Sequence, residues 1–480
     1  MRIFPRHNDI NSIQYGFVIM IVENIMKKAT TKLLAFAQIL ASLLLFNLFH
    51  SDGRGAESGY FEKVYPASMH DGEGRLRIPV EWRLWIPEGV NELRGVVVHQ
   101  HGCGSGSGDG ARTAVYDLHW QELARKYDCA LIAASYRQGE FPCETWCDPR
   151  NGSASSFLAA LDYFADYTGR SELRVVPWVL WGHSGGGQWV GCMAHLYPER
   201  VVAACLRSGC PDTVVNIFRE LPLNDKVTDV PMMLNLGAFE YKIPFVWNSC
   251  WDYFREMRAK DAKICLLIDP HTEHEVGNTR YPDIRFLDLI MEKRLPQAGA
   301  TELGLSPVGV VLPESSISDE EISLFQDNFK EEVLDKSVLF NRRECLTDGI
   351  WFPSEEYVSH WRKYSLSSEW EDTTPPPAPY DVWIEDSGRL SWKCRADIES
   401  GLAGFILYKN GESIYKTEAA PVVNAAPIFQ GLMYSDTPDF SLPAMEYAIP
   451  NFDGQDGSLF EITSLNTKGL ESEKITCQRR

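Results

Sequence analysis

Residues 179–187 constrain the fold of this chain more than any other stretch. They read Val-Leu-Trp-Gly-His-Ser-Gly-Gly-Gly, so a short apolar run enters a Gly-x-Ser-x-Gly turn, and helix-like residues 188–197 follow. A strand, a sharp turn and a helix in this order hold a serine exposed at the end of a sheet. The flanking glycines fit this geometry, because the turn strains the serine backbone and leaves no room for a Cβ between strand and helix. The pattern predicts Ser184 as a nucleophile.

Strand-like and helix-like segments alternate from about residue 76 to residue 295. Short apolar runs, such as residues 95–99, 130–134 and 264–268, suit buried parallel strands. Longer stretches, such as residues 155–167 and 283–294, have the length and composition of helices. The alternation predicts an α/β fold with a mainly parallel sheet and helices on both faces.

After residue 295 the alternation ends, and the chain changes character again at a proline-rich stretch. Residues 373–379 are Thr-Thr-Pro-Pro-Pro-Ala-Pro, which predicts a stiff extended linker. Short strand-like segments follow, and Asn410-Gly411 between two of them predicts a hairpin, so we expect an all-β sandwich there. The predicted parts are residues 1–56 (N-terminal extension), 57–295 (α/β domain), 296–372 (helical extension, with helices near 318–335 and 355–364), 373–379 (linker) and 380–480 (β-sandwich).

The N-terminal extension has the features of an export signal. Lys27 and Lys28 precede an apolar run over residues 33–49, which is typical of a secretory signal peptide. A run of this length is also near the lower limit for crossing a bilayer, so an uncleaved membrane anchor is the alternative. We expect a secreted protein, or one of the periplasm or cell envelope.

Charge and cysteine content narrow the partners and the compartment. With 66 acidic and 46 basic residues the formal net charge is -20, which argues against nucleic acid as a partner because that needs a basic face. Twelve cysteines in 480 residues are too few for a disulfide scaffold. In an exported protein Cys143 and Cys147 are the best candidates for a pair, because they are close together in an expected loop.

A serine nucleophile needs a base to take its proton and a carboxylate to orient that base. The acid is expected just past the strand at residues 232–236, where Glu240 is the first carboxylate; Asp212, after an earlier strand, is the alternative. The base is expected just past the next strand, where His271 and His274 both qualify and the pattern does not separate them. The order Ser, acid, His is the one this chemistry uses on an α/β sheet.

The developing oxyanion needs backbone N–H donors, one of them directly after the nucleophile. Gly185 supplies this first donor. The second is expected in residues 99–106, His-Gln-His-Gly-Cys-Gly-Ser-Gly, which directly follow a strand, and the Cys103 amide is the candidate. His99 and His101 form an H-x-H pair, which together with His271 or His274 could suggest a metal site. We expect a histidine that supports this loop instead, because the nucleophile turn already explains the site.

These residues resemble the α/β-hydrolase superfamily, in particular secreted bacterial members with a fibronectin type III-like C-terminal domain. The resemblance covers about residues 76–295 and 375–477. Residues 269–281 look like that group's His-Glu-x-Gly segment, which favours His274 as the base, and Gly237 to Glu240 looks like its Gly-x-x-Glu turn, which favours Glu240 as the acid.

The C-terminal part matches its module less closely. Trp392 resembles the early-strand tryptophan of fibronectin modules, whereas Phe460 stands where those modules usually carry a tyrosine. The insertion at residues 419–447 also departs from a minimal module. We expect this domain to be a spacer, with a contact to carbohydrate or to another envelope protein as the alternative.

The resemblance and the residues together predict a serine hydrolase, first of all a carboxylic-ester hydrolase that works through an acyl-enzyme. Its substrate is then a small-molecule or polymer-linked ester, residues 210–228 are a candidate cap over the site, and no metal or organic cofactor is expected. Two alternatives are a serine peptidase on the same fold and a non-catalytic binding or adhesion protein on a hydrolase scaffold.

Overall fold

The computed structural model describes residues 58–68, 76–104, 108, 110, 114–316, 347–417, 419–422, 425–432, 434–436, 438, 445–455 and 457–480. The expected export signal and the acidic helix near residues 318–335 lie outside these residues. Within them, no helix has the length and apolar character needed to cross a membrane.

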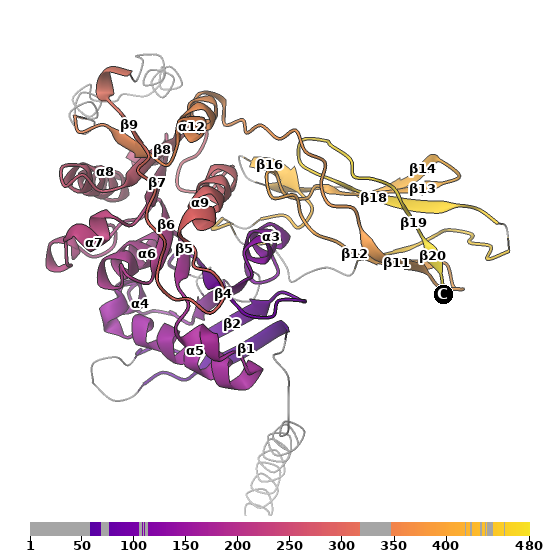
Figure 1. Cartoon of the computed structure of the whole chain (residues 1–480), viewed down its shortest axis with the longest axis horizontal. Helices are drawn as coiled ribbons and strands as arrows, with labels where there is room; N and C mark the ends of the chain where they lie inside the picture. The colour runs from indigo at the N-terminus through magenta and orange to yellow at the C-terminus, as the bar shows by residue number, and fades with distance from the viewer. Residues whose placement is uncertain are drawn as a thin grey trace, which may run out of the picture. The chain divides into compact units, whose positions relative to one another are not determined.

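An eight-stranded sheet forms the centre of the α/β part, in the order β1-β2-β4-β3-β5-β6-β7-β8 (Figure 1). β2 pairs antiparallel with β1 and with β4, and every other neighbouring pair is parallel. This large, mainly parallel sheet matches the α/β-hydrolase expectation. The strands are β1 (Gly59–Tyr65), β2 (Val80–Ile86), β3 (Gly95–Gln100), β4 (Cys129–Tyr136), β5 (Trp178–His183), β6 (Val201–Arg207), β7 (Met232–Gly237) and β8 (Ile264–Asp269).

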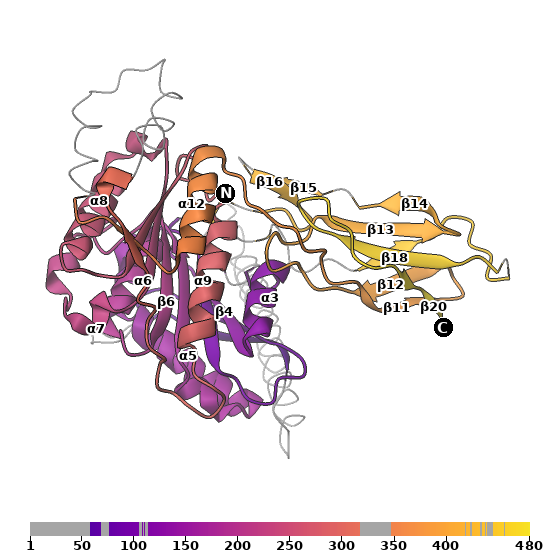
Figure 2. The same ribbon diagram turned by 45° about the horizontal axis from the view of Figure 1, so that its top comes forward.

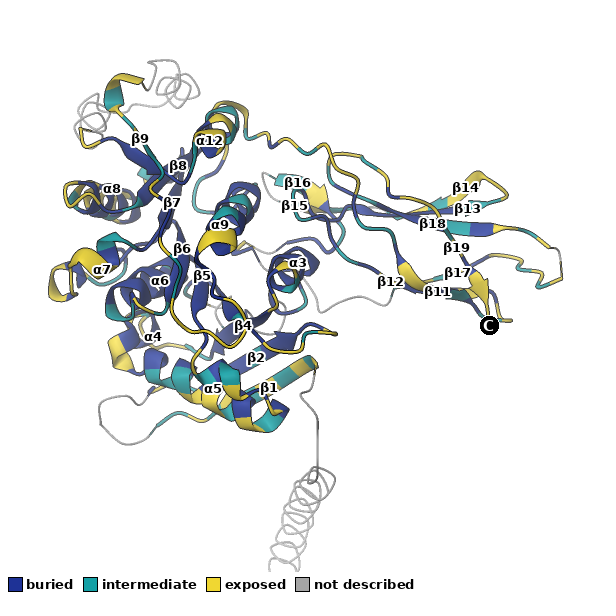
Figure 3. Ribbon diagram, in the orientation of Figure 1, coloured by how far each residue is buried: buried dark blue, intermediate teal, exposed yellow. Residues whose placement is uncertain are grey.

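Helices cover both faces of this sheet, as the alternating pattern predicts (Figures 1 and 2). One face carries α3 (Leu118–Lys126), α9 (Arg280–Arg294) and α12 (Glu355–Ser367), and the other carries α5 (Ser153–Thr168), α6 (Gly185–Leu196) and α8 (Pro244–Arg258). Strands β3 to β8 are buried along their whole length, because helices shield them on both sides (Figure 3). The loops that follow the carboxyl ends of the parallel strands meet at one edge of the sheet, where they can bring polar groups together.

The segment that follows α9 closes one end of the sheet. A short pair, β9 (Val310–Leu312) with β10 (Ile350–Phe352), leads into α12, which includes the predicted helix near residues 355–364. Trp361 of α12 donates its indole N–H to the Leu266 carbonyl at 2.8 Å, and Tyr364 donates its hydroxyl to Asp269 at 2.5 Å. α12 thus packs on β8, immediately before the loop that carries the two candidate histidines.

The C-terminal residues form two four-stranded sheets, with the orders β17-β12-β11-β20 and β14-β13-β18-β19. The hairpin predicted at Asn410-Gly411 joins β13 to β14, and both residues have the positive φ (52° and 87°) that a tight hairpin turn requires. Trp392 and Phe405 pack edge to face between the sheets at 5.1 Å. The two-sheet core agrees with the expected sandwich, while the fibronectin type III assignment and the domain boundaries stay predictions. Its strands are β11 (Tyr380–Ile384), β12 (Arg389–Lys393), β13 (Gly404–Lys409), β14 (Glu412–Lys416), β17 (Glu446–Ala448), β18 (Phe460–Leu465), β19 (Ile475–Thr476) and β20 (Gln478–Arg479).

Candidate active site

Ser184 stands between β5 and α6 in a backbone conformation that serines rarely adopt, with φ 56° and ψ -120°. The glycines around it allow this turn. A Cβ on Gly182 would overlap the Gly186 carbonyl, and a Cβ on Gly186 would overlap the carbonyls of Gln100 and His101. Strand, turn and the neighbouring loop after β3 therefore touch backbone to backbone, which only glycine permits. The sharp turn leaves the Ser184 side chain partly exposed at the edge of the sheet.

His274, in the loop after β8, is the histidine that the structure brings to Ser184. Its Nε2 lies 2.9 Å from the Ser184 Oγ. Its Nδ1 is hydrogen-bonded to the Glu240 carboxylate, which can only accept, so Nδ1 carries the proton and Nε2 is left to accept from the serine. The side chain of His271 is exposed, and its backbone amide donates to Asp269 at 3.0 Å. His271 is thus not brought to the nucleophile.

Glu240, just past β7, is fully buried, and both of its oxygens have partners. One oxygen bonds His274, and the other accepts the Ser208 hydroxyl at 2.9 Å and the Gly237 amide at 3.3 Å. The Arg207 guanidinium lies 3.5 Å from that second oxygen and is fully buried as well. A buried carboxylate needs such a counter-charge and such donors to remain ionised.

Asp212, the alternative acid, has a different role in the structure. Its carboxylate accepts the Phe218 amide at 2.7 Å, and this bond closes the turn in front of a short 3-10 helix. The structure therefore brings Glu240, and not Asp212, to the histidine.

The candidate cap at residues 210–228 is mostly loop. The Gln188 side chain of α6 accepts the amides of Val214 at 2.6 Å and Val215 at 3.2 Å.

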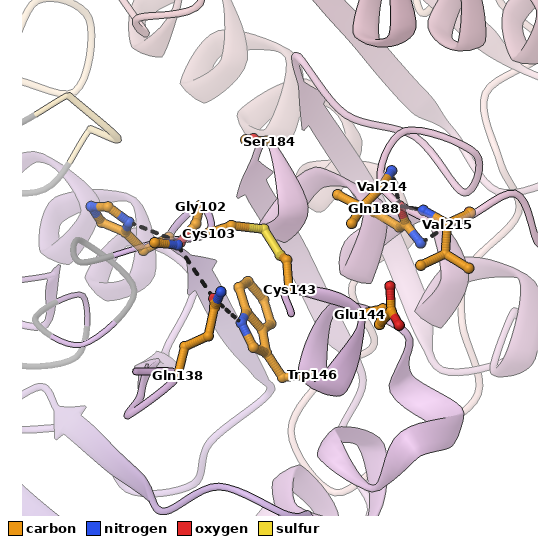
Figure 4. Close-up of a disulfide and its surroundings, with 12 residues drawn as sticks. Gly102, Cys103, Gln138, Cys143, Glu144, Trp146, Ser184, Gln188, Val214 and Val215 are labelled. Atoms are coloured by element: carbon orange, nitrogen blue, oxygen red, sulfur yellow. Dashed lines mark hydrogen bonds between the residues drawn. A yellow bond between two sulfur atoms is a disulfide. The ribbon is translucent and has the colours of Figure 1, made fainter. Parts of the chain in front are cut away.

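The two candidate oxyanion donors lie beside each other, and a disulfide joins this place to the rest of the fold. Cys103 pairs with Cys143, with their Cα atoms 5.7 Å apart (Figure 4). A Cβ on Gly185 would overlap the Cys103 sulfur and come within 2.7 Å of that of Cys143. The bridge thus contacts the first residue of α6. The backbone N–H groups at the start of a helix can bind an anion.

The expected pairing of Cys143 with Cys147 is wrong. Cys147 ends α4 (Glu144–Cys147), where it is buried and free. Cys143 stands directly before the first residue of α4, and its side chain points to Cys103 in the loop after β3 (Figure 4). Closeness in sequence was misleading, because the Cys143 sulfur is bonded to Cys103, which lies 40 positions earlier in the chain and next to Cys143 in the fold.

The Gln138 side chain holds the loop after β3 by hydrogen bonds. Its side-chain oxygen accepts the Gly104 amide at 3.3 Å and the Trp146 indole N–H at 2.9 Å (Figure 4). His101 is buried within the loop, and burial lowers its pKa to about 4, so the ring is neutral at pH 7. A neutral, buried ring agrees with the expected supporting role.

Arg207 and Ser208 are functional candidates that the sequence motifs do not predict. Besides facing Glu240, Arg207 donates to the Thr272 hydroxyl at 3.1 Å and to the Glu273 carbonyl at 3.4 Å, so it also holds the loop that carries His274. Ser208 has a φ of 53°, an uncommon conformation for serine. Their place directly after β6 was the available signal, since the ends of parallel strands meet at this edge.

One acidic cluster in the described part of the chain has the spacing of metal ligands. Asp372, Asp397 and Glu399 offer oxygens within 4.8 Å of one another. The Asn466 amide donates to Asp372 at 2.9 Å and to Asp397 at 3.1 Å, so hydrogen bonds within the fold account for this arrangement. None of these residues is among the predicted site residues.

No protein-family model and no curated protein sequence matches the chain. Solved structures are similar to part of it. A thermostable esterase shares 13% identity over 44% of this chain and 54% of that one, with a TM-score of 0.31, so the chain spans about half of its length. An S-formylglutathione hydrolase from Agrobacterium tumefaciens shares 12% identity over 50% and 96%, with a TM-score of 0.32. A siderophore hydrolase from Aspergillus nidulans shares 15% over 47% and 91%, with a TM-score of 0.31.

Proposed function

We propose that this chain is a serine hydrolase that cleaves carboxylic esters through an acyl-enzyme on Ser184. One observation carries the proposal: the serine hydroxyl, the His274 ring and the Glu240 carboxylate form one continuous row of hydrogen bonds. A row of this composition, starting from a strained and accessible serine, is the arrangement that activates a hydroxyl as a nucleophile.

In the first half of the reaction the Ser184 oxygen attacks the ester carbonyl carbon, and its proton passes to Nε2 of His274. Glu240 accepts the Nδ1–H throughout, so the ring keeps the tautomer that the attack needs and its positive charge is stabilised once formed. The tetrahedral intermediate then collapses, the imidazolium returns its proton to the leaving alkoxide, and the alcohol departs from an acyl-serine.

In the second half a water molecule repeats this sequence. His274 takes a proton from the water, the resulting hydroxide attacks the acyl carbonyl, and the protonated histidine gives the proton back to Ser184 as the acid leaves. The amides of Gly185 and Cys103 stabilise the negative oxygen in both tetrahedral intermediates. Removing one such donor from an enzyme costs about 10²–10³ in kcat.

We also propose that the protein works in an oxidising compartment, outside the cytoplasm. The Cys103–Cys143 bridge supports this, because structural disulfides persist in secreted and periplasmic proteins and are rare in reducing cytosol. A small-molecule or polymer-linked ester is the substrate class that such a site serves.

Hydrolysis of matched substrates tests the function. We expect the wild-type protein to hydrolyse p-nitrophenyl acetate, and Ser184→Ala to lose about 10⁴-fold or more in kcat. Ser359→Ala is the matched control, because this exposed serine on α12 lies outside the site and should leave kcat unchanged. Activity on aminoacyl amides without activity on the corresponding esters would instead favour the peptidase alternative.

A further inference from the structure

Three consecutive residues of the C-terminal part, Tyr434 to Asp436, lie against the loop that carries His274. The Val276 amide donates to the Tyr434 carbonyl at 3.4 Å. Two residues further along this loop, the Asn278 side chain accepts the Ala426 amide at 2.8 Å. The loop of the proposed base is therefore bordered by residues that follow it in sequence by about 150 positions.

Asp436 fixes this segment in place through buried charges. Its carboxylate accepts the Arg280 Nε–H at 2.7 Å and the Trp120 indole N–H at 2.9 Å. Arg280 in turn donates to Asp117 at 2.7 Å, and all three charged side chains are buried. Arg280 is the first residue of α9, which directly follows the loop of His274. This ion cluster therefore connects the C-terminal segment to the end of that loop.

Ser435 connects the segment to the catalytic base through His183. His183 Nε2 lies 2.6 Å from the His274 carbonyl oxygen, which can only accept, so Nε2 carries the proton. Burial foremost, with the neighbouring His274 and Arg207, holds the pKa of His183 well below its usual range, so the ring is neutral and Nδ1 has a free lone pair. The Ser435 hydroxyl lies 2.7 Å from Nδ1 and is the donor in that bond.

Tyr434 lies near both His183 and His274 and is exposed to solvent. Its ring centre lies 5.6 Å from that of His183 and 6.1 Å from that of His274, yet the residue is 53% exposed. The Tyr434 ring thus lies beside the proposed base and also faces solvent. The segment thus contributes to the surface of the site as well as to its support.

We propose that residues 434–436 complete the active site, with Ser435 as a positioning residue that acts through His183 on the backbone of His274. The Ser435 hydroxyl fixes the His183 tautomer whose Nε2–H holds the His274 carbonyl, and so keeps the catalytic ring between Glu240 and Ser184. This inference rests on the proposed function. It replaces the expected spacer role of the C-terminal domain with a direct part in the site.

Two variants of Ser435 and one control test the proposal in the full-length protein. Ser435→Ala removes the donor, and we expect kcat for p-nitrophenyl acetate to fall about tenfold, or about 1.4 kcal/mol, with KM changed by less than about twofold. Ser435→Thr keeps the hydroxyl and should restore most of kcat. Arg395→Gln removes an ion pair with Glu122 that also joins the C-terminal part to α3 but is separate from residues 434–436, and it should leave kcat unchanged.

The outcomes separate positioning from packing. An unchanged kcat in Ser435→Ala, an equal loss in the alanine and threonine variants, or an equal loss in Arg395→Gln would overturn the positioning role. Thermal melting of each variant shows whether a loss of activity merely follows a loss of folded protein. A wild-type protein without any esterase activity would contradict the proposed function itself, and is thereby distinguished from a failure of this inference.

Discussion

At the scale of single residues, Glu240 contacts both His274 and Arg207, and each contact gives it a different role. In the proposed mechanism it orients His274, and its carboxylate also faces the fully buried guanidinium of Arg207. Removing one member of a buried ion pair leaves the other charge without compensation, which usually costs about 3–5 kcal/mol. Activity and stability are therefore coupled at this one side chain.

Replacing Glu240 by glutamine should expose both roles. Glu240→Gln keeps the shape but loses the charge and the acceptor for the Nδ1–H, so we expect kcat to fall by about 10⁴, as when the orienting carboxylate of such a triad is replaced by an amide. The free energy of unfolding in urea should fall by roughly 3 kcal/mol.

Asp212→Asn is the matched control for this change, because Asp212 bonds the Phe218 amide and does not face His274. Its kcat should equal that of the wild type. The assignment of the acid would be wrong if Asp212→Asn were inactive while Glu240→Gln retained full kcat.

At the scale of elements, the described residues of the loop after β3 are held by partners elsewhere in the fold. Residues 102–106 read Gly-Cys-Gly-Ser-Gly, a composition with little to pack. The Cys103–Cys143 bridge and the Gln138 side chain supply the missing fixation. Placement of the Cys103 amide therefore depends on a covalent bond to a residue 40 positions away.

Removing this bridge should lower kcat in a protein that still folds. In the double variant Cys103→Ser, Cys143→Ser the loop loses its tether, and we expect kcat to fall about tenfold, less than the loss of an oxyanion donor outright. The free energy of unfolding should fall by about 2–4 kcal/mol. Dithiothreitol should lower the kcat of the wild type in the same way and leave the double variant unaffected. A double variant with wild-type kcat would show that the bridge does not position the loop.

At the scale of the whole molecule, a buried ion cluster joins the C-terminal part to the α/β part. Burial alone would raise the pKa of Asp436, but Arg280 and His99 outweigh it and lower the pKa from 3.8 to about 2. Because the folded-state pKa lies below the unfolded one, the carboxylate stabilises the fold above about pH 4. This contribution is lost as the pH falls through 2, and it amounts to roughly 2 kcal/mol.

The stability of Asp436→Asn should reveal this contribution. At pH 7 we expect the variant to unfold in urea with a free energy about 3–5 kcal/mol below the wild type, because Arg280 keeps only Asp117 as counter-charge. The gap should narrow as the pH falls from 5 toward 2. Asp381→Asn, in an exposed pair with Lys393, should stay within about 0.5 kcal/mol of the wild type throughout. A gap for Asp436→Asn that does not change with pH would contradict the role of the charge.

The sequence predicted the parts of the site that follow from strand order. Ser184, Glu240 and His274 each come directly after a parallel strand, and the carboxyl ends of such strands meet at one edge. The Cys103–Cys143 bridge could not be predicted in this way, because it joins two segments 40 positions apart that only the folded chain brings together. The contact of Ser435 with His183 joins residues 252 positions apart. No local pattern specifies such a contact, which arises only when two folded parts pack together.

Covalent labelling is the sharpest test of whether Ser184 is an activated nucleophile. A fluorophosphonate reacts with a serine only when a base activates it, so we expect intact wild-type protein to gain the mass of one adduct, located on Ser184 by peptide mapping. Ser184→Ala should gain none, while Ser359→Ala should be labelled like the wild type. Full labelling of Ser184→Ala, or a wild-type protein that remains unlabelled, would show that Ser184 is not the activated nucleophile.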